Sequence, residues 1–329
     1  MGAKTKKKVY FVGVDLGATK ILAGVYDSRL NFIGKAKLST KANRGYREVV
    51  RRIARCISDA IDECEVSLKQ VKAVGIGAPA AVDPDTGKVI FAPNLNWKNK
   101  PLRDDLQVLI KRPIQVDNDC NVCALGVYEQ ELTPKPKSML GIFLGTGIGG
   151  GIILNGKLHH GFNQTAGEIG HMLINFDGPE TTWGSRGTFE MYAGRQSIYR
   201  AIREAIAKGE KTVLTEMLGP ELKDLRSGDL RKALKRDDAL VRRIVHDAAV
   251  ATGIVVGNMV NLLNPQVIAL GGGVMEALSK EMMPVIQETA PRHALPGTIK
   301  GIRIFASKLA DYAGIAGAAV LAKRLSQRQ

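Results

Sequence analysis

A glycine-rich stretch near the middle of the 329-residue chain is the first feature that could do chemistry. Residues 143–154, FLGTGIGGGIIL, contain five glycines between β-forming flanks. Because glycine has no Cβ, a phosphate can closely approach the backbone N–H groups of such a loop. A second loop, LGATK at residues 16–20, and a third at residues 271–273 repeat the feature. Together the three loops favour the interpretation that they bind a phosphorylated ligand over the alternative that they are ordinary turns.

The order of the predicted elements excludes the two commonest nucleotide-binding motifs. A dinucleotide fingerprint needs its glycines to open a helix, whereas residues 145–151 lead into a strand-forming sequence. A Walker loop needs Gly-Lys followed by Ser or Thr, which these loops lack. We therefore expect hairpin tips to present N–H groups, and residues 271–273 to open a helix against a phosphate or an adenosine. The glycines expected to contact the ligand are Gly17, Gly145, Gly147, Gly149, Gly272 and Gly273.

Asp119 is the carboxylate best placed by the sequence to act as a general base. It lies where a predicted strand, PIQVDND, meets a predicted helix that starts at Cys120. The helix dipole favours the ionised carboxylate, which can accept a proton from a hydroxyl group. Asp is also a good helix N-cap, and the local sequence leaves both roles open.

Four further polar residues border the glycine turns. Asp15 directly precedes the first turn, where it could orient Mg²⁺ through water beside phosphates or stabilise the turn itself. Thr19 and Thr146 carry hydroxyl groups suited to phosphate contact. Lys20 is a further candidate, although a residue within a strand can point away from the site.

Alternating strands and helices must position these residues. Apolar spacing and turn residues predict the elements. In the first half we expect strands at residues 9–15, 21–27, 32–40 and 113–119, helices at 45–64, 101–112 and 120–132, and a strand followed by a loop within 71–83. In the second half we expect a strand pair within 140–155, helices at 189–209, within 211–236 and at 238–263, and strand–helix pairs within 265–282 and 301–325.

Two of these strand pairs resemble one another. VGVDLGATKILAGVYD at residues 12–27 aligns without gaps with LGIFLGTGIGGGIILN at residues 140–155. The alignment matches Gly13 with Gly141, Leu16 with Leu144, and Gly17 with Gly145. This spacing predicts two similar lobes, each opening with a β-hairpin that has a glycine-rich turn.

Composition limits the class of protein further. No run of eighteen apolar residues and no signal-peptide pattern is present, so we expect no membrane span. Four cysteines are too few for a disulfide scaffold, which fits a reducing compartment and a cytoplasmic location. The net charge of +15 favours either an anionic partner or a solvated basic surface. Because basic patches interleaved with aromatic residues are missing, we expect no nucleic-acid partner.

Seven motifs in order along the chain carry a family likeness. They are VDLGATKI, GIGAPAAVDPDTG, APNLNW, DNDCNVCALGVYE, LGTGIGGGII, AGEIGH and IALGGGV. Together they resemble the ROK family of sugar kinases and repressors, particularly its glucokinase branch. The resemblance implies an α/β, two-lobed actin-like ATPase (ribonuclease H-like) fold with duplicated mixed sheets flanked by helices. The implied lobes span residues 1–118 and 119–309, with a C-terminal helix at about 310–329 packing back on the first.

The resemblance also implies an activity and its residues. The activity is ATP-dependent phosphorylation of a hexose, above all glucose to glucose 6-phosphate, with ATP held by the glycine loops, Mg²⁺ near Asp15, and Asp119 as the base. The residues implied in sugar binding are Asn94, Asn118, Asp119, Glu168, His171 and Glu190. Ala80 stands where the family usually has a glycine in a loop that presents its backbone to the sugar, so this change could alter specificity.

One departure from the family concerns a metal site. Many relatives bind zinc through the His of the GEIGH motif and three cysteines in the segment that follows. Here Thr181, Trp183 and Thr188 occupy the cysteine positions, and neither Thr nor Trp is a suitable zinc ligand. Cys120 and Cys123 lack two further ligands nearby. We therefore expect no structural zinc.

Three alternatives remain open from the sequence. The acceptor could be fructose, mannose or an N-acetylhexosamine, and the donor could be polyphosphate. A non-enzymatic alternative is a sugar-sensing ROK regulator, although Asp119 and the loop glycines are all present. Relatives imply a homo-oligomer, either a dimer or a tetramer.

Overall fold

The computed structural model describes residues 8–182 and 184–328. Its first part is a five-stranded sheet in the order β3-β2-β1-β4-β8. The β2 strand runs antiparallel to β1 and β3, whereas β4 and β8 run parallel to β1. The carboxyl ends of β1, β4 and β8 therefore meet at one edge. The strands are β1 (Tyr10–Leu16), β2 (Lys20–Asp27), β3 (Phe32–Ser39), β4 (Val71–Ala78) and β8 (Ile114–Asn118).

A second five-stranded sheet repeats this topology in the order β11-β10-β9-β12-β13. Again the first two strands in sequence form an antiparallel hairpin, and the last two strands run parallel to the first of them. The predicted duplication is confirmed, because both sheets have the same strand order and each opens with an antiparallel hairpin. The strands are β9 (Ser138–Leu144), β10 (Ile148–Leu154), β11 (Lys157–Leu158), β12 (Val267–Gly271) and β13 (Arg303–Ala306).

A small antiparallel sheet lies after β4, partly in the predicted loop and partly in residues 84–100, for which the sequence predicted no strand or helix. Its strands are β5 (Ala81–Asp83), β6 (Lys88–Ala92) and β7 (Trp97–Lys100), in the order β5-β6-β7. Trp97 is 2% exposed, and its ring packs edge-on against Tyr46. Such short strands escape a periodicity argument because only a few residues in each alternate.

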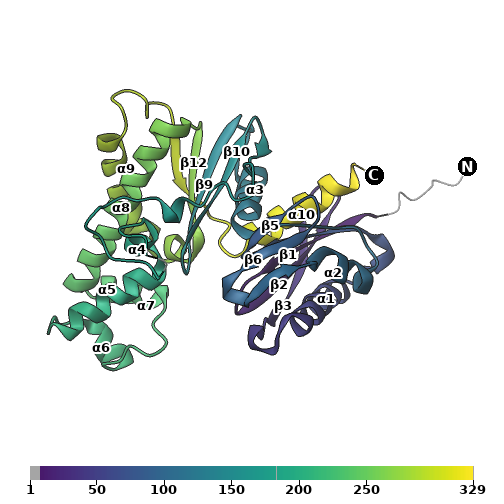
Figure 1. Ribbon diagram of the computed structural model, residues 1–329, viewed down its shortest axis with the longest axis horizontal. Coiled ribbons are helices and arrows are strands. Elements are labelled where there is room, and N and C mark those ends of the chain that lie inside the picture. Colours follow the sequence, from purple (N-terminus) through teal and green to yellow (C-terminus); the bar gives the residue numbers. More distant parts are fainter. Residues whose placement is uncertain (1–7, 183, 329) are drawn as a thin grey trace, which may run out of the picture.

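Helices cover both faces of each large sheet (Figure 1). On the first sheet α1 and α2 cover one face, and α10 covers the other. On the second sheet α3 covers β9 and β10, while α9 packs on the opposite face beneath α8. The helices are α1 (Tyr46–Glu63), α2 (Leu102–Ile110), α3 (Asp119–Glu131), α4 (Glu190–Ala193), α5 (Arg195–Ala207), α6 (Val213–Leu218), α7 (Ser227–Lys235), α8 (Ala239–Leu263), α9 (Gly272–His293) and α10 (Tyr312–Ser326).

The α3 and α10 helices lie between the two sheets and pack against each other (Figure 1). Each follows the last strand of one sheet and covers the other sheet. Glycines allow the close crossing: a Cβ on Gly317 would lie 1.8 Å from the carbonyl oxygen of Val122, and one on Gly126 would lie 2.1 Å from that of Ala313. The α10 helix also lies against β1 and β4, where the Cβ-free Gly13 and Gly75 face it.

The helix expected over residues 189–209 is interrupted, so that prediction was wrong in one respect. Gly194 has an extended backbone, with ψ 145, and it separates α4 from α5. The interruption lets the N–H of Arg195 donate to the carbonyl of Gly145 (3.1 Å), which ties the start of α5 to the glycine-rich turn. Helical periodicity did not show this break because the apolar spacing continues through it. Across the described residues, no helix is both long and apolar enough to span a membrane.

Candidate active site

A cleft of about 1120 Å³ lies between the carboxyl edges of the two large sheets. It is lined by most of the residues that the sequence singled out, although they come from distant parts of the chain. These are Asp15, Gly17, Thr19, Ala80, Asn94, Asn118, Asp119, Gly145, Thr146, Gly147, Gly149, Glu168, His171 and Gly272. Lys20, Glu190 and Gly273 do not line it.

Asp119 begins α3 at the bottom of this cleft. Burial, with Glu168 as a nearby like charge, raises the pKa of its carboxyl to about 6, although the N–H of Cys120 opposes the shift by donating to Oδ1 (2.8 Å). Because Asn118, and not Asp119, is the N-cap residue of α3, the alternative of Asp119 as a mere N-cap is wrong. A carboxylate with a pKa near 6 is ionised at neutral pH and close to the range suited to a general base.

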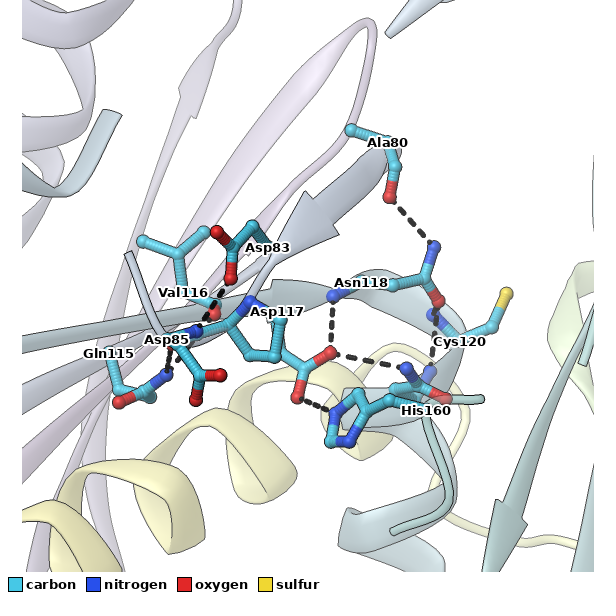
Figure 2. A network of polar contacts seen from close by, with 11 residues as sticks. Ala80, Asp83, Asp85, Gln115, Val116, Asp117, Asn118, Cys120 and His160 are labelled. Carbon is cyan, nitrogen blue, oxygen red and sulfur yellow. Dashed lines mark hydrogen bonds and ion pairs between the residues drawn. The ribbon is translucent and has the colours of Figure 1, made fainter. Parts of the chain in front are cut away.

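Asn118 holds this junction in place. Its Oδ1 accepts from the N–H groups of Cys120 (2.9 Å) and Asn121 (3.0 Å). Its Nδ2 donates to the carbonyl of Ala80 (3.1 Å) in the loop after β4. The β8–α3 junction is therefore fixed to the neighbouring strand at the edge where the parallel strands end, as Figure 2 shows.

Asp15 lies near the end of β1 and lines the same cleft as Asp119. Burial raises the pKa of Asp15 to about 7, and the carboxylates of Asp119 and Asp311 add to the shift, whereas Lys20 opposes it. Within the described residues the Asp15 carboxylate accepts no hydrogen bond from the turn at residues 17–19, so a turn-stabilising role finds no support. Lys20 forms an ion pair with Asp311.

The two hairpin tips have matching surroundings. At the first tip Thr40, which is fully buried, donates through Oγ1 to the carbonyl of Gly17 (2.6 Å) and through N–H to that of Thr19 (2.9 Å). At the second tip the start of α5 donates to the carbonyls of Gly145 and Thr146. In the described part of the chain, the N–H groups of residues 18, 19, 146 and 147 donate to no protein acceptor. Each tip thus offers two adjacent donors to an anion.

Close packing accounts for part of the glycine content of residues 145–151. A Cβ on Gly149 would lie 2.4 Å from Sγ of Cys120, and one on Gly151 would lie 2.5 Å from Cβ of Ala124, both on α3. A Cβ on Gly147 would lie 2.2 Å from Oε2 of Glu190. The same Oε2 accepts from the N–H of Ile148 (2.7 Å), so the Glu190 carboxylate supports the turn from behind.

A contact between a buried carboxylate and a partly exposed histidine, which the sequence did not reveal, lies beside the junction. Asp117 is 2% exposed, and its Oδ2 lies 2.8 Å from Nε2 of His160. Oδ1 of the same carboxylate accepts from the N–H of Asn118 (2.7 Å), as Figure 2 shows, and from Nδ2 of Asn121 (3.1 Å). His160 also accepts, through its carbonyl, from the N–H of Ala166 (2.9 Å), two residues before Glu168. The hydrogen bond to Asp117 raises the pKa of His160.

The segment between His171 and Glu190 is held by protein contacts. Gly187 donates to Pro179 (2.9 Å) and accepts from the N–H of Ile174 (2.9 Å), and Arg186 pairs with Glu180 (3.2 Å). Thr188 is buried, whereas Trp183 lies outside the described residues. Among the described residues no group of three or more His, Cys, Asp or Glu side chains could hold a metal ion. That the protein needs no zinc stays a prediction.

Cys120 and Cys123 line the cleft as free thiols on adjoining turns of α3. Burial and the neighbouring carboxylates raise the pKa of both thiols well above the usual range. The thiol forms therefore dominate near neutral pH, and both side chains serve as packing residues next to Asp119.

Fold and cleft together define a class of protein. Two sheets of identical topology, with a cleft at their carboxyl edges, form the actin-like two-domain fold. The structure of a ROK family glucokinase from Streptomyces griseus, in complex with glucose and AMPPNP, matches with a TM-score of 0.84 and 29% identity, over 96% of this chain and 99% of that chain. The chain belongs to the ROK family, whose profile matches residues 11–325.

Relatives within the family differ in function. A glucokinase from Halalkalibacterium halodurans is 32% identical over 316 residues, or 96% of this chain and 95% of that protein. An N-acetyl-D-glucosamine kinase from Aliivibrio salmonicida is 30% identical over 323 residues, covering 94% and 99%. A xylose repressor from Caldicellulosiruptor bescii is 27% identical over 312 residues, covering 93% of this chain and 76% of the repressor. These similarities support a sugar kinase without fixing the sugar.

Proposed function

We propose that this chain transfers the γ-phosphoryl group of ATP to the 6-hydroxyl of glucose. The observation that carries the proposal is the placement of Asp119 and both glycine turns around one cleft. Phosphoryl transfer requires a base, an anion-binding cradle and a positioned acceptor, and little covalent chemistry besides. The similarity to a glucokinase solved with glucose and AMPPNP supports both the donor and the acceptor.

Asp119 is the proposed base. Its carboxylate accepts the proton of the sugar hydroxyl while that oxygen forms a bond to the γ-phosphorus and the bond from phosphorus to the bridging oxygen of ADP breaks. The products are the sugar 6-phosphate, ADP and a protonated Asp119, which returns its proton to solvent. The pKa of about 6 keeps the carboxylate ionised at neutral pH before the transfer.

Polar groups on the Asp119 side of the cleft are proposed to bind the sugar. A carboxylate or amide that pairs with two hydroxyl groups is left unpaired by a sugar that lacks one of them, and this penalty produces specificity. Glu190 supports the turn at residues 145–147, so we propose that it contributes through the turn. The proposed sugar-binding residues are Ala80 (through its backbone), Asn94, Asn118, Glu168 and His171.

The hairpin tips are proposed to bind the phosphates of the donor. Both tips line the cleft, with Thr19 in the first and Thr146 in the second, and Gly272, the first residue of α9, lines it too. Lys20 and Gly273 do not line the cleft, and we propose that they contribute to donor binding without contacting the donor. Lys20 would do so through its ion pair with Asp311.

The cleft fits a magnesium ion only as a partner of the donor. No described group of three or more ligands could hold a metal. A nearby cation would, however, reduce the repulsion between Asp15 and the carboxylates that raise its pKa. Mg²⁺ usually retains water ligands and binds one or two carboxylates together with substrate phosphates. We propose that Asp15 orients such an ion through water, where it would neutralise charge on the phosphates.

A panel of acceptors and donors tests the assignment. Release of ADP, or loss of polyphosphate, would be measured with glucose, fructose, mannose and N-acetylglucosamine, each with ATP and with polyphosphate. We expect the highest kcat/KM for glucose with ATP. A higher value for N-acetylglucosamine, for another sugar or for polyphosphate would replace the proposed substrate pair.

Replacing the base separates a kinase from a sugar sensor. Asp119→Ala is expected to lower kcat at least about 100-fold, within the range of general base catalysis, while glucose still binds by calorimetry. Turnover close to the wild-type rate in Asp119→Ala would remove Asp119 from the mechanism. A wild-type chain that binds glucose but phosphorylates none of the sugars would favour the regulator alternative.

A further inference from the structure

Arg195, which the sequence did not single out, connects the two glycine loops of the second sheet. It is the first residue of α5, and its Nη2 donates to Oγ1 of Thr146 (2.5 Å) at the hairpin tip. Its Nη1 lies 3.9 Å from the position that a Cβ on Gly273 would occupy, at the start of α9. The guanidinium therefore stands between the tip at residues 145–147 and the glycines that open α9.

The charge balance of the cleft makes this position unusual. Among the described residues that line the cleft, Arg195 is the one Lys or Arg, whereas five side chains carry carboxylates: Asp15, Asp119, Glu168, Glu276 and Asp311. Within the same set no carboxylate lies within 4.0 Å of the Arg195 guanidinium, in contrast to Lys20, which pairs with Asp311. Arg195 is thus a cation at the cleft that forms no ion pair with a carboxylate of the described residues.

The chemistry of the guanidinium indicates what it recognises. It presents five N–H donors in a planar fork that matches phosphate oxygens. Among the described residues, the hydroxyl of Thr146 is the one side-chain group that accepts a hydrogen bond from it. A neutral sugar offers no charge to compensate the cation. A phosphate chain does, and it would approach the same Thr146 tip whose N–H groups are free.

We propose that Arg195 binds the phosphate chain of the donor and thereby determines selectivity for polyanionic donors. This inference rests on the proposed function, because it places the donor on the α5 side of the cleft. The backbone bonds from α5 to Gly145 and Thr146 make the arrangement rigid, so the guanidinium and the turn present their donors together. Both ATP and inorganic polyphosphate carry the recognised group, and the nucleoside does not.

Binding measurements on the full chain test the proposal without turnover. Calorimetry would compare Mg-ATP, Mg-tripolyphosphate, adenosine and glucose as ligands of the wild type, Arg195→Ala and Arg195→Lys. Arg203→Ala is the matched control, because Arg203 lies on the same helix, is exposed and does not line the cleft. We expect Arg195→Ala to weaken both phosphate ligands about 10- to 100-fold, as for loss of charged hydrogen bonds. The affinity of Arg195→Lys for the phosphate ligands should be intermediate. The affinities of both Arg195 variants for adenosine and glucose, and all affinities of the control variant, should match the wild type.

The outcomes distinguish this inference from the proposed function. Wild-type affinity for both phosphate ligands in Arg195→Ala, or an equal loss for adenosine, would overturn the role of Arg195 even if the protein phosphorylates glucose. Selective loss of phosphate binding would support it even if no sugar is phosphorylated. A wild-type chain that binds neither Mg-ATP nor Mg-tripolyphosphate would overturn both proposals.

Discussion

Nε2 of His160 lies 2.8 Å from Oδ2 of Asp117, and this contact joins the end of β8 to the loop that follows β11. Asp117 lies in the first sheet and His160 follows a strand of the second, so the pair connects the two sheets close to Asp119. The Asp117 carboxylate also accepts from Asn118 and Asn121, and the loop that it reaches carries Glu168.

The pair predicts a pH-dependent contribution to stability. The pKa of His160 is raised above its ordinary value of 6.5, so stabilisation by the charged form is fully present below about pH 6.5 and is lost as pH rises through the folded-state pKa. We expect His160→Gln to lower the free energy of unfolding more at pH 6 than at pH 9, as measured by urea denaturation. His246→Gln, at an exposed histidine 3.7 Å from Asp247, is the control. An equal loss at both pH values would contradict the expectation.

The raised pKa of Asp119 predicts the acid limb of the pH–rate profile. A base must be deprotonated, so kcat should fall as pH drops through about 6, whereas an ordinary carboxylate would sustain activity to about pH 4. Because Glu168 contributes to the shift, Glu168→Gln should move the inflection to lower pH in addition to weakening sugar binding. A kcat that stays constant down to pH 5 would show that Asp119 does not act as the base in the rate-limiting transfer.

Gly147 and Glu190 are predicted to be energetically coupled. Gly147→Ala places a Cβ 2.2 Å from Oε2 of Glu190 and should cost about 1–3 kcal/mol, as overpacking does. Gly145→Ala meets only the carbonyl oxygen of Gly147 at 3.8 Å and should cost less than about 0.5 kcal/mol. In a double-mutant cycle, Gly147→Ala with Glu190→Ala should cost less than the sum of the two single changes. If the two single costs simply add in the double variant, the Glu190 side chain and a Cβ at residue 147 do not compete for the same space.

The crossing of α3 and α10 depends on Gly317. Its Cβ would lie 1.8 Å from the backbone oxygen of Val122, which cannot move without shifting α3, so Gly317→Ala should cost about 3 kcal/mol or more. Gly228 in α7 has no neighbour within 4 Å, and Gly228→Ala should instead raise stability by about 0.4–1 kcal/mol. Thermal and denaturant unfolding of both variants would check these opposite signs.

Removal of zinc is predicted to have no effect. Thr181 and Thr188 stand where the family resemblance implies cysteine ligands, and backbone hydrogen bonds around Gly187 hold this segment. Prolonged treatment with a zinc chelator, followed by resupply of Mg²⁺, should leave both activity and the melting temperature unchanged. A fall in either, restored by Zn²⁺, would reveal a metal site.

The sequence by itself determined the duplicated hairpins, the residues at their tips and the strand–helix order, because these depend on local patterns. Apolar periodicity marks a helix, and glycine next to a strand marks a turn, whatever lies opposite in space. The likeness of residues 12–27 to residues 140–155 even indicated the duplication, which the common sheet order then confirmed.

Only the tertiary structure decided which side chains meet. Asp117 and His160 are 43 residues apart, and Arg195 and Thr146 are 49 residues apart, so no local rule relates them. The break at Gly194 likewise accompanies a hydrogen bond from the N–H of Arg195 to the carbonyl of Gly145, an interaction that helical periodicity does not report. Contacts of this kind depend on how two sheets and their helices pack in three dimensions, whereas sequence patterns report only the neighbourhood within one element.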